Sequence, residues 1–243
     1  MACGMSVNDL VLVQGMADTK LALSRWNERP WTVLRPWLRL SFGIAVLLLL
    51  VVYGIAELTT PDSSRYILPG VNSDAGLDDY VAVLFRNSLV LALHAMACVA
   101  GFIAGSAMPL SASHRSGFSR AVHQKAGTFA IVFVLCATMF SLATQAYVIG
   151  SQASTIALQL GITPGALILT LLPHAIPELV ALFLPLAAWI IASRRDEWHD
   201  LLAATAVTVA VAVPTLLMAA AVEIWVSPLI MDAISTHQPP LHG

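Results

Sequence analysis

The stretch WLRLSFGIAVLLLLVVYGIA, at Trp37–Ala56, decides the fold class, because it contains the uninterrupted apolar run Ala45–Val52. A helix needs about 20 mostly apolar residues to cross roughly 30 Å of hydrocarbon. Four further stretches approach or exceed that length: Ser88–Leu110, Ala126–Ile149, Pro164–Ala192 and Leu201–Val226. We therefore expect an all-α fold, a polytopic membrane helix bundle with five transmembrane helices.

The composition of the chain agrees with a membrane protein. Of its 243 residues, 58% are hydrophobic and only 11% are charged, whereas a soluble domain has about 25% charged residues. The net charge of −2 excludes a strongly basic surface for nucleic acid. Cys3, Cys98 and Cys136 lack the spacing of a disulfide framework or a zinc site. We expect the lipid bilayer as the surroundings, with no cofactor, no metal and no nucleic acid partner.

If all five stretches span the membrane, the basic residues fall almost entirely on one side of it. Ten of the twelve lie in the N-terminal part, the second connection and the fourth connection: Lys20, Arg25, Arg29, Arg35, Arg39, Arg115, Arg120, Lys125, Arg194 and Arg195. Only Arg65 and Arg86 lie on the other side. Cytoplasmic segments are enriched in Lys and Arg, so we expect the N-terminus inside and the C-terminus outside.

This topology divides the chain into three parts. Residues 1–36 are expected to form a cytoplasmic N-terminal tail, with an interfacial helix within Leu21–Leu34, where basic, aromatic and apolar residues mix. Residues 37–227 are expected to form the five-helix transmembrane domain. Residues 228–243 are expected to form a short extracytoplasmic C-terminal tail.

The fourth apolar stretch is longer than one span needs and contains Pro173, Pro177 and Pro185. A proline inside a helix removes one backbone hydrogen bond and kinks or breaks the helix. We expect a helix break near Pro173–Pro177, with a short outer piece before it and the span after it. Broken helices at membrane depth pack against protein or line a polar cavity.

Five polar side chains are expected to gather in the outer third of the membrane: Arg86, Asn87, His174, Glu178 and Glu223. Ionisable residues inside a bilayer are costly, so each is a candidate for function. His174 and Glu178 are four residues apart, which places them on one face of a helix. The group is either a functional or assembly site, or an Arg86–glutamate pair that only ties helices together.

Two features of the second stretch have simpler explanations. His94 lies in an otherwise apolar segment, where a single histidine is more often a packed hydrogen-bonding group than a ligand. Gly101 and Gly105 form a G-x-x-x-G pair, which lets two helix backbones approach closely. That helix packing fits either a homodimer contact or a contact within the monomer.

The sequence lacks the motifs of several enzyme classes. It has no Walker A loop, no G-x-S-x-G elbow and no H-E-x-x-H zinc pair. His174 and Glu178 could bind one metal ion together with Glu223, but scattered ligands of this kind do not define a metal site. We therefore expect no catalytic residue and no enzyme activity.

Three motifs resemble those of stage II sporulation protein M family integral membrane proteins. The run LLPHAIPEL, at Leu171–Leu179, is similar to the family's PHG-x-x-EL signature, with Ala175 where the family usually has glycine. The run AAVEIWVSP, at Ala220–Pro228, is similar to its closing A-x-x-E-x-x-x-(S/T)-P pattern, and Phe85–Gly105 is similar to its second helix. The three motifs occur in the family's order.

The resemblance implies a bacterial cell (inner) membrane protein, multi-pass, without enzymatic chemistry, and its polar signature falls on Asn87, His174, Glu178 and Glu223. Sporulation members act as scaffolds in a peptidoglycan-remodelling complex, and other relatives are encoded beside ABC-type ATPases. We expect a scaffold or permease-like subunit of a larger assembly, with ABC-type ATPase, cell-envelope or homodimer partners. The alternatives are an export permease that works with a separate ATPase on a peptide or lipid-like substrate, and an intramembrane metal-dependent enzyme.

Overall fold

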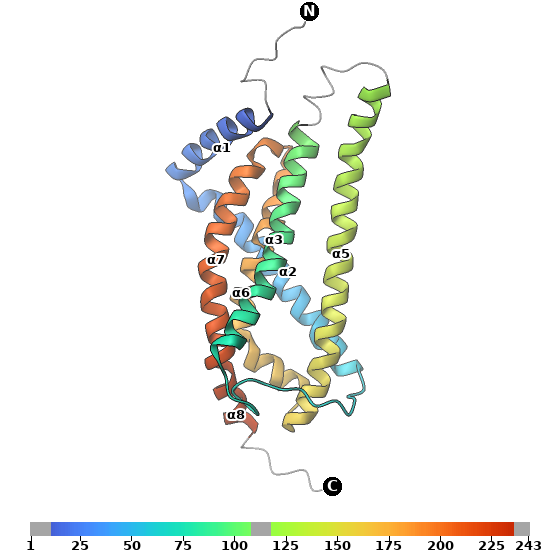
Figure 1. The fold of residues 1–243 in the computed structure, drawn as a ribbon, viewed down its shortest axis with the longest axis vertical. Helices are drawn as coiled ribbons and strands as arrows, with labels where there is room; N and C mark the ends of the chain where they lie inside the picture. The colour runs from blue at the N-terminus through green and yellow to red at the C-terminus, as the bar shows by residue number, and fades with distance from the viewer. Residues whose placement is uncertain (1–10, 108–117, 236–243) are drawn as a thin grey trace, which may run out of the picture. The chain divides into compact units, whose positions relative to one another are not determined.

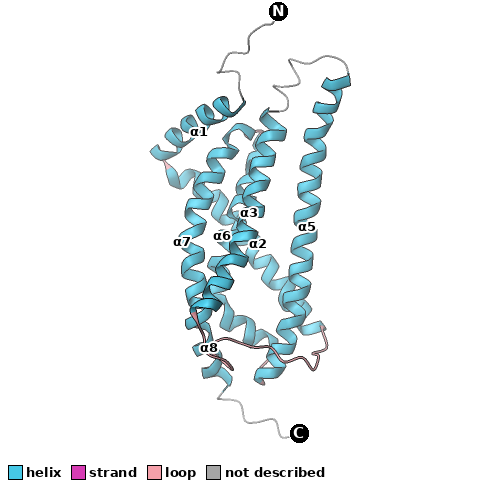
Figure 2. Ribbon diagram, in the orientation of Figure 1, coloured by secondary structure: helices cyan, strands magenta, loops and turns pink. Residues whose placement is uncertain are grey.

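A computed structural model describes residues 11–107 and 118–235 of the chain. All regular secondary structure in these residues is helical (Figure 2). The elements are α1 (Val11–Glu28), α2 (Pro30–Leu58), α3 (Leu77–Phe102), the π-helical turn η2 (Ile103–Ala107), α5 (Phe118–Leu160), α6 (Pro164–Arg195), the 3-10 turn η3 (Trp198–Asp200), α7 (Leu201–Trp225) and α8 (Ser227–Ser235). The predicted all-α class is confirmed.

Four helices in the described part are long and apolar enough to cross a membrane: Pro30–Leu58, Leu77–Gly105, Pro164–Arg195 and Trp198–Ser235. Large apolar side chains on them are exposed, among them Leu47, Leu93 and Met218. A protein surrounded by water buries most such side chains and leaves only small apolar patches exposed. The helices therefore have the surface of a multi-pass membrane protein. The third predicted span, Ala126–Ile149, lies within α5.

The helices divide into two compact units. The first comprises the described residues of Met1–Ser41, Leu91–Ala137 and Phe183–Val211. The second comprises the described residues of Phe42–Val90, Thr138–Leu182 and Ala212–Gly243. The long helices α2, α3, α5, α6 and α7 each contribute one segment to each unit.

The core of the first unit is built on tryptophan and small residues. Trp37 packs with Leu184, Ala188 and Ala204, all at most 5% exposed. The N-terminal helix α1 belongs to this unit and lies beside the first turns of α7 (Figure 1). The stretch Leu21–Leu34, in which an interfacial helix was expected, is divided between two helices. α1 ends at Glu28, and Pro30 begins α2. Proline fits the first turn of a helix, where its missing amide hydrogen has no partner to lose.

In the second unit, alanines let the ends of α2 and α5 pack closely. Ala56, Ala153 and Ala157 form an apolar cluster with residues of α6 and α8. A Cβ added to Gly150 would lie 2.7 Å from Ile55 Cβ, so this glycine is required where the two helices meet. The connection at 59–76 runs past the end of α5 toward α8 (Figure 1).

The break predicted near Pro173–Pro177 is not seen, because α6 is one continuous helix from Pro164 to Arg195. Packing before the prolines supports its first turns: Leu167 is 1% exposed in the apolar cluster, and Thr170 Oγ1 donates to Leu167 O at 2.6 Å. These contacts hold the segment helical although each proline removes one backbone hydrogen bond. Two other expectations lie partly outside the described residues: the basic connection Ser111–Lys125, and the C-terminal tail, of which the structure describes α8.

Candidate functional site: a polar cluster beside a pocket in the second unit

The five polar residues singled out in the sequence all belong to the second unit. Three helices supply them: Arg86 and Asn87 from α3, His174 and Glu178 from α6, and Glu223 from α7. Ser227, the first residue of α8, joins them. We call these six residues the polar cluster.

At the exposed edge of the polar cluster, Arg86 faces Glu223. Arg86 Nη2 lies 3.8 Å from Glu223 Oε1, and the side chains are 69% and 27% exposed. A pair this long and this exposed adds little stability. The tie between α3 and α7 in this region comes more from packing, since Val83, Ala220 and Ile224 form a buried cluster there.

Deeper in the polar cluster, Asn87 lies next to Glu178. Asn87 is 4% exposed, and Glu178 interacts electrostatically with Asn87, Glu223 and Arg86. Asn87 Nδ2 and Glu178 Oε2 are both buried and form no short hydrogen bond in the described part of the chain, but the Asn87 amide still acts on the Glu178 carboxylate as a weak hydrogen-bond partner. A buried polar atom without a partner costs about 1–3 kcal/mol. Because Nδ2 donates and Oε2 accepts, this cost favours pairing of the two side chains with each other.

The polar cluster also contains a short buried hydrogen bond. His174 Nδ1 lies 2.7 Å from Ser227 Oγ, and the two residues are 7% and 0% exposed. This bond joins α6 to the start of α8. Ser227 was missed as a site residue, because a serine at the end of an apolar stretch has no distinctive spacing to any other polar residue. Its place in the motif at Ala220–Pro228 was the signal available in the sequence.

His174, Glu223 and Ser227 line a pocket of about 240 Å³. A fourth polar side chain, Gln152 of α5, also faces it. The remaining walls are apolar and come from the 59–76 connection and from α5, α6, α7 and α8: Leu68, Pro69, Val71, Ile149, Ala153, Ile156, Leu167, Leu171, Ile224, Pro228 and Met231. Mostly apolar walls with a few convergent polar groups are typical of sites that bind small organic ligands. We call this space the outer pocket.

Within residues 11–107 and 118–235, no group of three or more His, Cys, Asp or Glu side chains is placed to hold a metal ion. His174 is instead bonded to Ser227, and Glu178 does not line the outer pocket. The arrangement can bind a hydroxyl, amide or ammonium group through Glu223 and His174 and hold an apolar group beside it.

The remaining residues singled out in the sequence lie in the first unit. His94 is 3% exposed and packs against Phe183, with ring centroids 5.6 Å apart. Gly101 faces Trp189, where an added Cβ would lie 2.6 Å from Nε1. Gly105 faces Trp198 even more closely. The G-x-x-x-G pair therefore makes room for tryptophans of the same chain.

No protein family, curated protein or solved structure matches the chain. The resemblance to the stage II sporulation protein M family stays a hypothesis carried by the three motifs.

Proposed function

We propose that the chain is a permease-like subunit of a larger membrane assembly, and that the outer pocket binds the polar end of a peptide or lipid-like substrate. The observation that carries this proposal is the outer pocket itself, where His174, Glu223 and Ser227 meet apolar walls. Gln152 supports it, because a further polar side chain in a mostly apolar pocket adds a hydrogen-bonding group for a ligand.

The proposed topology has five spans, with α5 supplying the third and the N-terminus in the cytoplasm. The distribution of Lys and Arg supports this orientation. Pro173 and Pro177 have a role in the proposal, because the turns around them lack two backbone hydrogen bonds. This part of α6 is the segment that bends or opens when a substrate enters. The resemblance to stage II sporulation protein M proteins supports a bacterial inner membrane location and a separate ABC-type ATPase as partner.

A scaffold role in a cell-envelope complex is the second candidate, and one observation favours it. The connection at 59–76 is fixed to α5 by hydrogen bonds from Asp62 N to Thr155 Oγ1 at 3.2 Å and from Tyr66 N to Gln159 Oε1 at 2.9 Å. A connection held in this way presents a fixed surface to a partner. The metal-dependent enzyme is not favoured, since the described residues hold no group of three ligands.

The test is purification of the intact protein from its own membranes in mild detergent, with mass spectrometry of bound proteins and small molecules. The proposal predicts a co-purifying ATPase and a bound amphipathic compound that is lost from the Glu223→Gln variant. Glu57→Gln is the matched control, because Glu57 is an exposed glutamate at the end of α2 that does not line the outer pocket. Cell-wall enzymes as partners, with the same bound compounds in both variants, would support the scaffold instead.

A further inference from the structure

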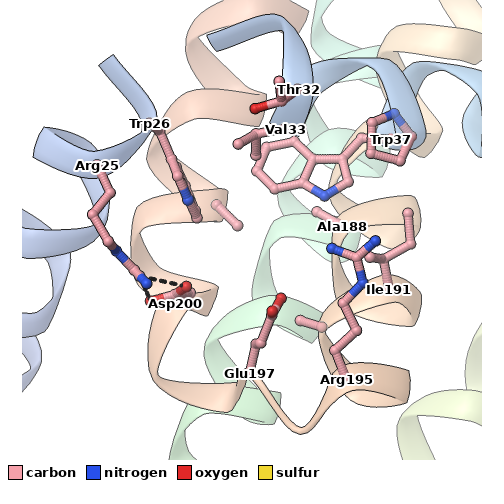
Figure 3. Close-up of a pocket in the computed structure, with 13 residues that line it drawn as sticks. Arg25, Trp26, Thr32, Val33, Trp37, Ala188, Ile191, Arg195, Glu197 and Asp200 are labelled. Carbon is pink, nitrogen blue, oxygen red and sulfur yellow. Dashed lines mark hydrogen bonds and ion pairs between the residues drawn. The ribbon is translucent and has the colours of Figure 1, made fainter. Parts of the chain in front are cut away.

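A second pocket, of about 220 Å³, lies within the first unit between α1, the start of α2, the end of α6 and the start of α7. We call it the inner pocket. Its walls are apolar, from residues such as Val33, Ala188 and Ile191, and its rim is charged (Figure 3). None of the polar cluster residues lines it.

Two of the four charged side chains at the rim already form a pair. Arg25 Nη2 donates to Asp200 Oδ1 and Oδ2 at 2.9 and 2.8 Å. These two hydrogen bonds hold α1 against η3. The other two, Arg195 and Glu197, have no ion-pair partner in the part of the chain that the structure describes. Figure 3 shows the Arg195 guanidinium and the Glu197 carboxylate both pointing toward the space beneath Trp37. One free positive group and one free negative group therefore share the inner pocket.

Aromatic side chains form the wall opposite these charges. Trp26 and Trp37 are in edge-to-face contact, with ring centroids 5.4 Å apart. The face of an indole attracts an organic cation, and this attraction strengthens when the cation is partly removed from water. A ligand that carries both charges can therefore use the arginine, the glutamate and the indoles together.

The sequence places the inner pocket at the level of lipid headgroups. Arg194 and Arg195 end α6, and tryptophans at 26, 31, 37, 189 and 198 surround the same ends of the helices. Tryptophan is enriched at the boundary between hydrocarbon and headgroups. Basic pockets between membrane helices bind lipid headgroups through their phosphates. The acidic residue beside Arg195 distinguishes this pocket from one built for a purely anionic lipid.

We propose that the inner pocket binds the headgroup of a phospholipid with a primary amine, of the phosphatidylethanolamine class. Arg195 donates two parallel hydrogen bonds to the phosphate, as guanidinium groups do with such anions. Glu197 accepts hydrogen bonds from the ammonium group, which also contacts the indole wall. This proposal does not depend on the function proposed for the outer pocket.

The experiment uses the full chain reconstituted in nanodiscs with equal amounts of phosphatidylethanolamine, phosphatidylglycerol and phosphatidylcholine, followed by native mass spectrometry of the retained lipids. The wild type is expected to retain phosphatidylethanolamine preferentially. Arg195→Gln is expected to lower its occupancy about tenfold, the scale of one lost charge-assisted interaction. Glu197→Gln is expected to remove the preference for phosphatidylethanolamine over phosphatidylglycerol, because only the former carries an amine.

Two matched controls separate the pocket from general surface charge. Arg194 adjoins Arg195 but does not line the pocket, and Glu28 is an exposed glutamate outside it. Arg194→Gln and Glu28→Gln are expected to leave lipid retention unchanged. Equal losses in Arg194→Gln and Arg195→Gln, or a wild type without lipid preference, would overturn the proposal. Displacement of the lipid by an equal concentration of soluble phosphoethanolamine would also overturn it, because the ligand would then be a soluble metabolite.

Discussion

His174 Nδ1 and Ser227 Oγ lie 2.7 Å apart in a buried position, so one hydrogen bond holds the proline-rich half of α6 against the start of α8. Without the serine hydroxyl, a buried ring nitrogen would lose its partner. Such a loss costs more than the bond contributes in water, because the nitrogen cannot be rehydrated. The same two side chains line the outer pocket, so this bond determines both stability and pocket shape.

Replacing Ser227 by alanine is therefore expected to destabilise the protein by about 1–3 kcal/mol. Thermal unfolding in detergent, followed by intrinsic tryptophan fluorescence, measures the change. Ser151→Ala is the control, because the Ser151 hydroxyl bonds to Val148 O at 3.0 Å in an exposed position, where water can replace it. Equal unfolding temperatures for the two variants would contradict a structural role for the His174–Ser227 bond.

Glu178→Gln is expected to leave stability unchanged or slightly raised and to change substrate binding only modestly, because Glu178 does not line the outer pocket and acts on it only through Glu223. The substitution keeps the size of the side chain and removes the repulsion between Glu178 and Glu223. Thermal unfolding measures the first effect, and recovery of the bound compound by mass spectrometry measures the second. Glu57→Gln serves again as the exposed control. A large fall in stability together with normal binding would show that Glu178 is structural.

Two helical glycines, Gly105 of the first unit and Gly43 of the second, give a pair of opposite predictions. Gly105→Ala is expected to destabilise by about 1–3 kcal/mol, because the added methyl group would overlap the Trp198 ring in a packed site. Gly43→Ala in α2 is expected to be neutral or to stabilise by about 0.5–1 kcal/mol, since nothing lies within 4 Å of its added Cβ and alanine favours helix. Thermal unfolding of both variants decides the matter. Similar changes in the two would argue against the close packing at Gly105.

Five spans with the N-terminus inside predict the accessibility of single cysteines. After replacement of Cys3, Cys98 and Cys136 by serine, a cysteine at Ser64 is expected to react with a membrane-impermeant maleimide in intact cells. A cysteine at Ser193 is expected to react only after the membrane is opened. Ser64 lies in the connection that follows α2, and Ser193 lies in the last turn of α6. The reverse pattern would invert the orientation, and reaction of both in intact cells would require an even number of spans between Ser64 and Ser193.

The long helices were predictable because each is recognised from the mean hydropathy of about 20 consecutive residues. The stretch at Pro164–Ala192 maps onto α6 with nearly the same ends. The sequence could not show whether the prolines break this helix. The outcome depends on packing by α2, α5 and α8 around Leu167. Proline acts on one hydrogen bond, whereas burial acts on many contacts at once.

The polar cluster could be predicted in part. Arg86, Asn87, His174, Glu178 and Glu223 stand out against an apolar background, and counting residues along each helix gives a depth. Counting cannot say which side chains touch, because that depends on rotation of each helix about its axis. The contribution of Ser227, and the separation of the outer pocket from the Asn87–Glu178 pair, follow from that rotation.

The connection between α2 and α3 gives the outer pocket an unusual wall. Leu68, Pro69 and Val71 face the pocket, while the same segment is tied to α5 through backbone groups that donate to Thr155 and Gln159. Moving that wall requires these hydrogen bonds to break and Val71 to leave the apolar cluster against which it packs. The outer pocket can therefore be opened on this side only when directional bonds and apolar contacts are lost together.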